Sequence, residues 1–167
     1  MGKIISPIEF VEIITNPVIF LAGPIRGAPK WHEEAIKYLF SQEENLTIVS
    51  PSRINRTKIP SEKFSRQREW ELYYLDLASK KGAIMFWLPG ETEHKCEKSY
   101  GAMTRIELGE SFVKYSKDNS FRFCIGSDGK FSELDTIKVD LEEYVPGKRI
   151  FTTLKETCDE ALKIARQ

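Results

Sequence analysis

Two glutamates in the sequence have the residue type and setting to do chemistry together, Glu107 and Glu71. Glu107 stands between Ile106 and Leu108, where its carboxylate could be partly desolvated and directed at an electrophilic carbon. A second carboxylate beside it would act as acid or base for a leaving group. By pattern alone, a first-turn glutamate that offsets a helix dipole is the commoner role for Glu107.

A second candidate is the turn at residues 23–27, which follows a short apolar run and contains Arg26. Its small residues allow backbone N–H groups to approach a ligand, and the Arg26 guanidinium can hold a phosphate or a carboxylate bidentately. The alternative is an ordinary surface turn with a solvated arginine. The turn is neither a GxGxxG nor a Walker A sequence, so the usual signals for dinucleotide binding and ATP hydrolysis are missing.

Strands and helices must position these residues, and the sequence alternates between the apolar runs typical of strands and the amphipathic patterns typical of helices. Short apolar runs predict five strands, at residues 18–22, 47–49, 83–88, 121–125 and 137–141. Helical spacing predicts helices over residues 30–44, 66–81, 100–117 and 154–165, the last with Thr152 or Thr153 as N-cap. Residues 52–65 are expected to form a long loop. This alternation predicts one α/β domain over residues 1–167 with a mostly parallel sheet.

In such a sheet the ligand lies beyond the carboxyl ends of the strands. The helix that precedes the central strand begins at this edge, so its early residue Glu71 is expected near Glu107. Asp76 lies roughly 7–8 Å further along the helix and is interpreted as a surface charge.

The composition limits the possible partners. Twenty-five basic and twenty-five acidic residues cancel, which favours a small ligand over DNA or RNA, and no apolar run is long enough to span a membrane. The N-terminus lacks a signal-peptide pattern and the three cysteines are far apart, so we expect a cytoplasmic protein. His94 and Cys96 have no second pair to complete a metal site, and we expect neither a metal ion nor a cofactor.

Four motifs are recognisable together: FLAGPIRG at residues 20–27, WE at 70–71, FWLP at 86–89 and ELG at 107–109. In order and approximate spacing they resemble the nucleoside 2-deoxyribosyltransferase family and its relatives, the nucleoside 5′-monophosphate N-glycosidases. The resemblance covers about residues 18–110.

The resemblance implies a flavodoxin-like or Rossmann-like three-layer sandwich that assembles into a homodimer or larger homo-oligomer and acts on a nucleoside or nucleotide. It implies that Glu107 attacks the anomeric carbon to form a covalent glycosyl intermediate, with Glu71 as the second carboxylate. The substrate-binding residues expected on this basis are Phe20, Gly23, Pro24, Ile25, Arg26, Gly27, Trp87 and Thr104.

The sequence departs from the family pattern at two places. Phe20 stands where transferases often carry a tyrosine whose hydroxyl contacts the nucleophile, so another group, such as Thr104 or the backbone, must orient Glu107. Residues 99–102 stand where an aspartate would hold the sugar 5′-hydroxyl. Arg26, by contrast, resembles the arginine with which nucleotide N-glycosidases hold a 5′-phosphate.

Three functions remain open at this point: a base-exchanging transferase, a nucleoside 5′-monophosphate N-glycosidase, and a non-catalytic nucleotide-binding module. A Glu107 that is buried in an ion pair or points away from the cavity would favour the module.

Overall fold

The computed structural model describes residues 2–52, 64–94, 97 and 99–167. Strands and helices alternate along this part of the chain, which contains six strands and five helices. The strands are β1 (Lys3–Ile5), β2 (Val18–Ala22), β3 (Thr47–Val49), β4 (Gly82–Leu88), β5 (Phe123–Ser127) and β6 (Ile150–Phe151). The helices are α1 (Trp31–Gln42), α2 (Phe64–Lys81), α3 (Ala102–Lys117), α4 (Leu134–Tyr144) and α5 (Leu154–Ala165).

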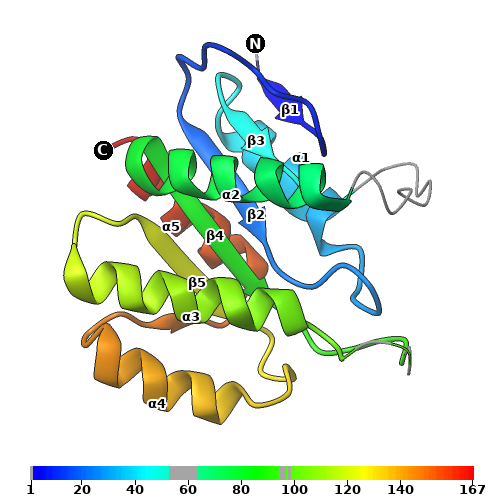
Figure 1. The fold of residues 1–167 in the computed structure, drawn as a ribbon, viewed down its shortest axis with the longest axis vertical. Helices are drawn as coiled ribbons and strands as arrows, with labels where there is room; N and C mark the ends of the chain where they lie inside the picture. The colour runs from blue at the N-terminus through cyan, green and yellow to red at the C-terminus, as the bar shows by residue number, and fades with distance from the viewer. Residues whose placement is uncertain (1, 53–63, 95–96, 98) are drawn as a thin grey trace.

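All six strands are parallel and follow the order β1-β3-β2-β4-β5-β6 (Figure 1). Without the edge strand β1, this is the flavodoxin-like order 2-1-3-4-5. The predicted fold class is therefore confirmed, with six strands in place of five. The order reverses between β2 and β4, so the ligand site of this topology is expected at the carboxyl ends of these two strands.

The strand predicted at residues 137–141 is wrong, because this segment belongs to helix α4. Ile137, Val139 and Leu141 alternate with polar residues and so imitate a strand. Leu134, Ile137 and Leu141 are also spaced three and four residues apart, and these three are buried while Val139 is 69% exposed. The helical spacing therefore determines the structure.

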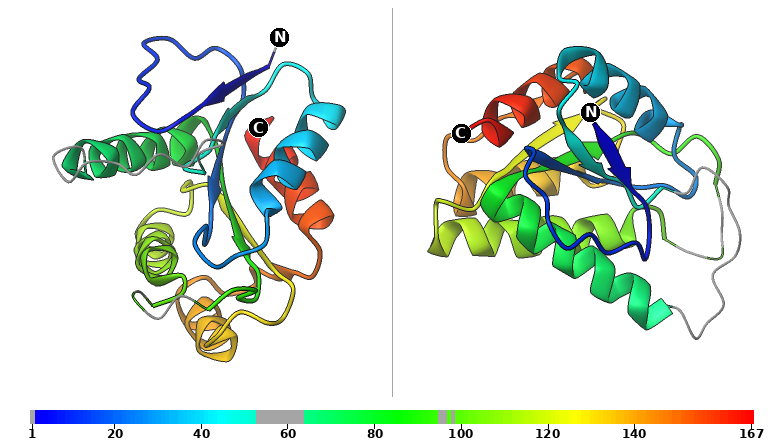
Figure 2. Two further views of the ribbon diagram at one scale, coloured as in Figure 1. Left: turned by 90° about the vertical axis from the view of Figure 1, so that its right-hand side faces the viewer. Right: turned by 90° about the horizontal axis from the view of Figure 1, so that it is seen from above.

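The sheet is the middle of three layers (Figure 2). Helices α2, α3 and α4 lie on one side of it, and α1 and α5 lie on the other. Strand β4 is buried along its whole length because both of its faces are covered. Its side chains alternate, so that Phe86 packs on the side of α2 and α3 while Met85 and Trp87 pack on the side of α1 and α5.

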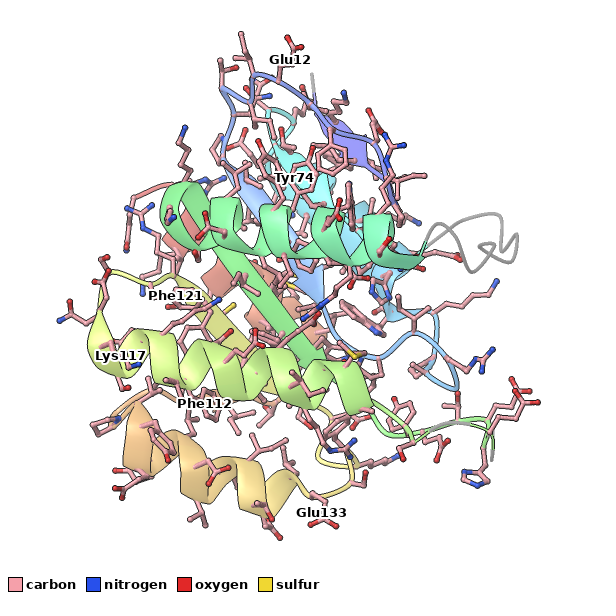
Figure 3. All side chains as sticks on the ribbon, in the orientation of Figure 1. Glu12, Tyr74, Phe112, Lys117, Phe121 and Glu133 are labelled. Carbon is pink, nitrogen blue, oxygen red and sulfur yellow. The ribbon has the colours of Figure 1, made fainter. Side chains whose placement is uncertain are left out.

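Helix α2 is anchored to the N-terminal segment by two aromatic side chains. The indole of Trp70 donates a hydrogen bond to the Glu9 carbonyl at 2.8 Å. The hydroxyl of Tyr74, which is labelled in Figure 3, donates to the same carbonyl at 3.2 Å and accepts from the Val11 amide at 2.9 Å. These bonds fix the rotation of α2 about its axis and thereby the direction in which Glu71 points.

Candidate active site

A cavity of about 270 Å³ opens where the sheet order reverses, beyond the carboxyl ends of β2 and β4. This volume is near the lower end of the range of small-molecule sites. The predicted site residues in its wall are Phe20, Gly23, Pro24, Ile25, Arg26, Glu71, Thr104 and Glu107. The wall also contains Ala22, Pro51, Glu91, Ser99, Tyr100, Gly101, Ala102 and Met103, which the sequence analysis did not assign to substrate.

Glu107 lies in the second turn of α3, since the helix begins at Ala102. The helix-dipole explanation of this glutamate therefore does not hold, because that interaction is confined to the first turn. Its side chain is 10% exposed. Of the two apolar neighbours, Leu108 is buried but Ile106 is 51% exposed, so the burial of Glu107 does not come from both flanking residues.

One guanidinium nitrogen joins the two carboxylates. Arg68 Nη1 donates a hydrogen bond to Glu107 Oε1 at 2.7 Å and lies 3.2 Å from Glu71 Oε2. The other oxygen of Glu71 accepts a hydrogen bond from Gln67 Nε2 at 3.0 Å. The side chains of Arg68 and Glu71 are 23% and 17% exposed. Helices α2 and α3 thus bring together a cluster of two acids and one base that is mostly shielded from solvent.

The ionisation of Glu107 reflects this environment. Burial raises the pKa of Glu107 from 4.5 to about 7, because desolvation penalises the charged form. The hydrogen bond from Arg68 lowers this pKa, while the negative charges of Glu71 and Glu110 raise it. A carboxylate that titrates near neutrality in a cavity is a common property of functional sites.

The turn after β2 supplies the opposite side of the cavity. Gly23 has φ +156°, and a Cβ there would lie 2.3 Å from the Trp87 carbonyl oxygen, so the backbone requires glycine at this position. Arg26 follows with a side chain that is 53% exposed, and its Nη1 lies 3.7 Å from a carboxylate oxygen of Glu97. Its guanidinium is accessible to a ligand in the cavity.

Two of the predicted binding residues are not in the wall of the cavity. These are Gly27 and Trp87. The Gly27 carbonyl accepts hydrogen bonds from the amides of Thr92 and Glu93 at 2.8 and 3.1 Å, so Gly27 links the turn to the loop after β4. The Trp87 side chain points to the opposite face of the sheet and packs in the core beneath α1 and α5. Neither residue is in the wall of this cavity, and their role in substrate binding stays a prediction.

Arg68, the residue that joins the two acids, is not among the site residues predicted from the sequence. Its spacing held a signal, because Arg68 lies three residues before Glu71 and therefore on the same face of α2. The contact with Glu107 spans 39 residues in sequence and needs the fold to reveal it. Thr104 is buried in the cavity wall, but the hydrogen bond that we observe on the Glu107 carboxylate comes from Arg68.

The expectations about the loop at residues 52–65 and about a metal site can be compared with the structure only for the residues that it describes. Cys96 and most of the predicted loop at 52–65 lie outside them, whereas Phe64 and Ser65 already belong to α2. Within the described ranges, no group of three His, Cys, Asp or Glu side chains is arranged to hold a metal ion. No helix in the same ranges has the length and apolar character that a membrane span requires.

The chain is an α/β protein whose parallel sheet has flavodoxin-like order, with a cavity and a carboxylate pair at the edge where such sheets have their ligand sites. Comparison with known families is more specific. The model of the family described as nucleoside 2-deoxyribosyltransferase like matches residues 16–119, and the chain belongs to this family. The resemblance predicted from the four motifs is thereby confirmed. A search of the curated proteins finds no match to the chain.

Proposed function

We propose that this protein cleaves or transfers the N-glycosidic bond of a nucleoside or nucleotide, with Glu107 as nucleophile and Glu71 as acid or base. The observation that carries the proposal is that both carboxylates lie in the wall of one cavity and contact the same nitrogen of Arg68. Membership of the family supports the choice of substrate class.

The separation of the two carboxylates favours a covalent intermediate. Because Glu107 Oε1 and Glu71 Oε2 both contact Arg68 Nη1, these oxygens lie at most roughly 6 Å apart. Glycosidases with a covalent intermediate hold their carboxyl groups about 5–5.5 Å apart, whereas those that insert a water directly need about 6.5–9.5 Å. The upper limit for this pair of oxygens lies below the second range, which supports the proposal of a covalent intermediate.

The reaction follows in two steps. An oxygen of Glu107 forms a bond to the anomeric carbon while the bond from that carbon to the base breaks, and the base leaves with the electron pair and takes a proton from Glu71. A second base or a water molecule then attacks the same carbon and gives up a proton to Glu71. Glu107 is released as a carboxylate, and the anomeric configuration is retained.

The position of Arg26 favours a nucleoside 5′-monophosphate as the substrate. It thereby supports N-glycosidase activity as the alternative to base exchange. The Arg26 guanidinium is an exposed cation in the cavity wall, on the turn opposite the carboxylate pair. It can bind a phosphate with two parallel hydrogen bonds.

The third candidate is a non-catalytic nucleotide-binding module. The buried ion pair between Glu107 and Arg68 is the observation that favours such a module. Glu107 nevertheless lies in the wall of the cavity, which is the position that catalysis requires.

The test is to incubate the protein with a panel of nucleosides and their 5′-monophosphates, with and without a free acceptor base, beside the Glu107→Gln variant. Release of base without acceptor identifies a hydrolase, and exchange that requires acceptor identifies a transferase. The variant should lose either activity and should not accumulate a glycosyl adduct in mass spectrometry. If the wild-type protein neither releases nor exchanges a base from any substrate, the proposed function is wrong and the binding module is left.

A further inference from the structure

The nucleophile proposed above needs a hydrogen-bond donor to orient it, and the residue that follows from the family pattern cannot supply one. Phe20 occupies the position where the resemblance leads us to expect a tyrosine, and its ring is buried in the cavity wall with no hydroxyl to donate. The donor to Glu107 comes instead from α2, through Arg68.

We propose that Arg68 is the positioning residue of this site: it holds Oε1 of Glu107, favours the charged form of this carboxylate, and leaves Oε2 as the attacking oxygen. This inference rests on the proposed function for its role in the reaction, but the contact can be tested without it.

The geometry of the contact supports this role. The distance of 2.7 Å between Arg68 Nη1 and Glu107 Oε1 is that of a charge-assisted hydrogen bond. Both side chains are largely shielded from solvent, with 23% and 10% of their area exposed, so water screens the interaction less than it screens a surface ion pair. The guanidinium also contacts Glu71, one helical turn along α2, and this second contact restricts its movement.

The charged groups around Glu107 make Arg68 necessary for the ionisation of this carboxyl group. The charged groups that act on Glu107 from α2 are Arg68 and Glu71, and the charged group from α3 is Glu110. Glu110, the ionised form of Glu71 and burial all oppose the ionisation of Glu107. Without the guanidinium the nucleophile would be a buried carboxyl group beside two other acids, and it would stay protonated at neutral pH.

The same contact has a role in the second step. Once Glu107 is esterified by the sugar it carries no charge, and Arg68 then interacts with Glu71 as the remaining anion of the cluster. Arg68 therefore compensates the charge that moves from one carboxylate to the other, and Glu71 remains able to accept the proton of the incoming base or water.

The first experiment compares the pH dependence of kcat/KM for the wild-type protein, Arg68→Met and Arg68→Lys. The acidic limb should move upward by about 1–3 pH units in Arg68→Met, the usual effect of a neighbouring arginine on a carboxyl group. Arg68→Lys keeps the positive charge and should restore most of this shift. Arg66→Met is the matched control, because Arg66 lies two residues away on the same helix and is exposed.

The second experiment measures the titration of Glu107 directly by carbon-13 NMR of protein labelled at the glutamate carboxyl carbon, with Glu107→Gln to assign the signal. The Glu107 midpoint should rise in Arg68→Met and stay unchanged in Arg66→Met. If Arg68→Met does not fold, Arg68→Gln carries the same test because it also removes the charge.

The two experiments separate this inference from the proposed function. A wild-type protein without activity refutes the proposed function, while the NMR titration still decides whether Arg68 controls the charge of Glu107. Equal Glu107 midpoints in the wild-type protein and in the folded Arg68 variant that lacks the charge would overturn the inference, whatever the activity.

Discussion

Replacing Glu107 by glutamine should change how the stability of the protein depends on pH. Folding raises the pKa of this carboxyl group from 4.5 to about 7. Between these values the folded state holds a proton that the unfolded chain has released, so the free energy of unfolding falls as the pH rises. The contribution is fully present below pH 4.5 and is lost as the pH passes through about 7.

The magnitude follows from the size of the shift. At about 1.36 kcal/mol for each pH unit, the difference between the two pKa values corresponds to about 3 kcal/mol. The side chain of Glu107 is only 10% exposed, so solvent screening reduces this figure little. Glutamine has nearly the same shape, can still accept a hydrogen bond from Arg68, and does not titrate.

The assay is urea unfolding of the wild-type protein and Glu107→Gln at intervals from pH 4 to pH 8. Over this range the wild-type protein should lose about 3 kcal/mol of unfolding free energy relative to the variant. Glu142→Gln, a substitution of an exposed glutamate on α4, is the control and should show a nearly constant difference. A difference between wild type and Glu107→Gln that stays constant, or that grows in favour of the wild type, would refute the reasoning about burial of this carboxylate.

Two other substitutions test the ligand and the core. Arg26→Ala should weaken binding of a nucleoside 5′-monophosphate by about 1.5–3 kcal/mol, the value of a hydrogen bond to a charged group, when measured by calorimetry; an equal loss for the nucleoside would contradict a contact with phosphate. Gly126→Ala should lower the free energy of unfolding by about 1–3 kcal/mol, because the new Cβ would lie 1.9 Å from Thr157 Oγ1 and 2.9 Å from the Trp87 ring. An unchanged urea midpoint would show that these neighbours move aside at no cost.

The elements that the sequence predicted best are those whose burial leaves a clear pattern. The continuous apolar run of β4 indicated a strand covered on both faces, and the stripe over residues 154–165 matches α5 with Thr153 as its N-cap. Strands β1 and β6, of three and two residues, were not predicted, and each pairs with only one neighbouring strand at an edge of the sheet.

The part of the site that could be predicted from the sequence is the part that depends on the direction in which each helix and strand runs. The polarity of α2 relative to β4 placed Glu71 at the same edge as Glu107, and the cavity contains both. Trp87, in the motif at residues 86–89, does not line the cavity, because successive residues of a strand point to opposite faces and its side chain lies on the side of α1 and α5. Arg68 was missed because its contact with Glu107 depends on how two helices pack, which spacing within one helix does not reveal.

The layered arrangement also has a consequence for how the protein forms. The family match ends at residue 119, yet β4 pairs with β5, and one face of β4 packs against α5, the last helix of the chain. During synthesis from the N-terminus, β4 therefore leaves the ribosome well before the elements that cover it, and its apolar side chains stay exposed until the final helix emerges. A fragment that stops at residue 119 would lack β5 and α5, and we expect it to expose the face of β4 that α5 covers.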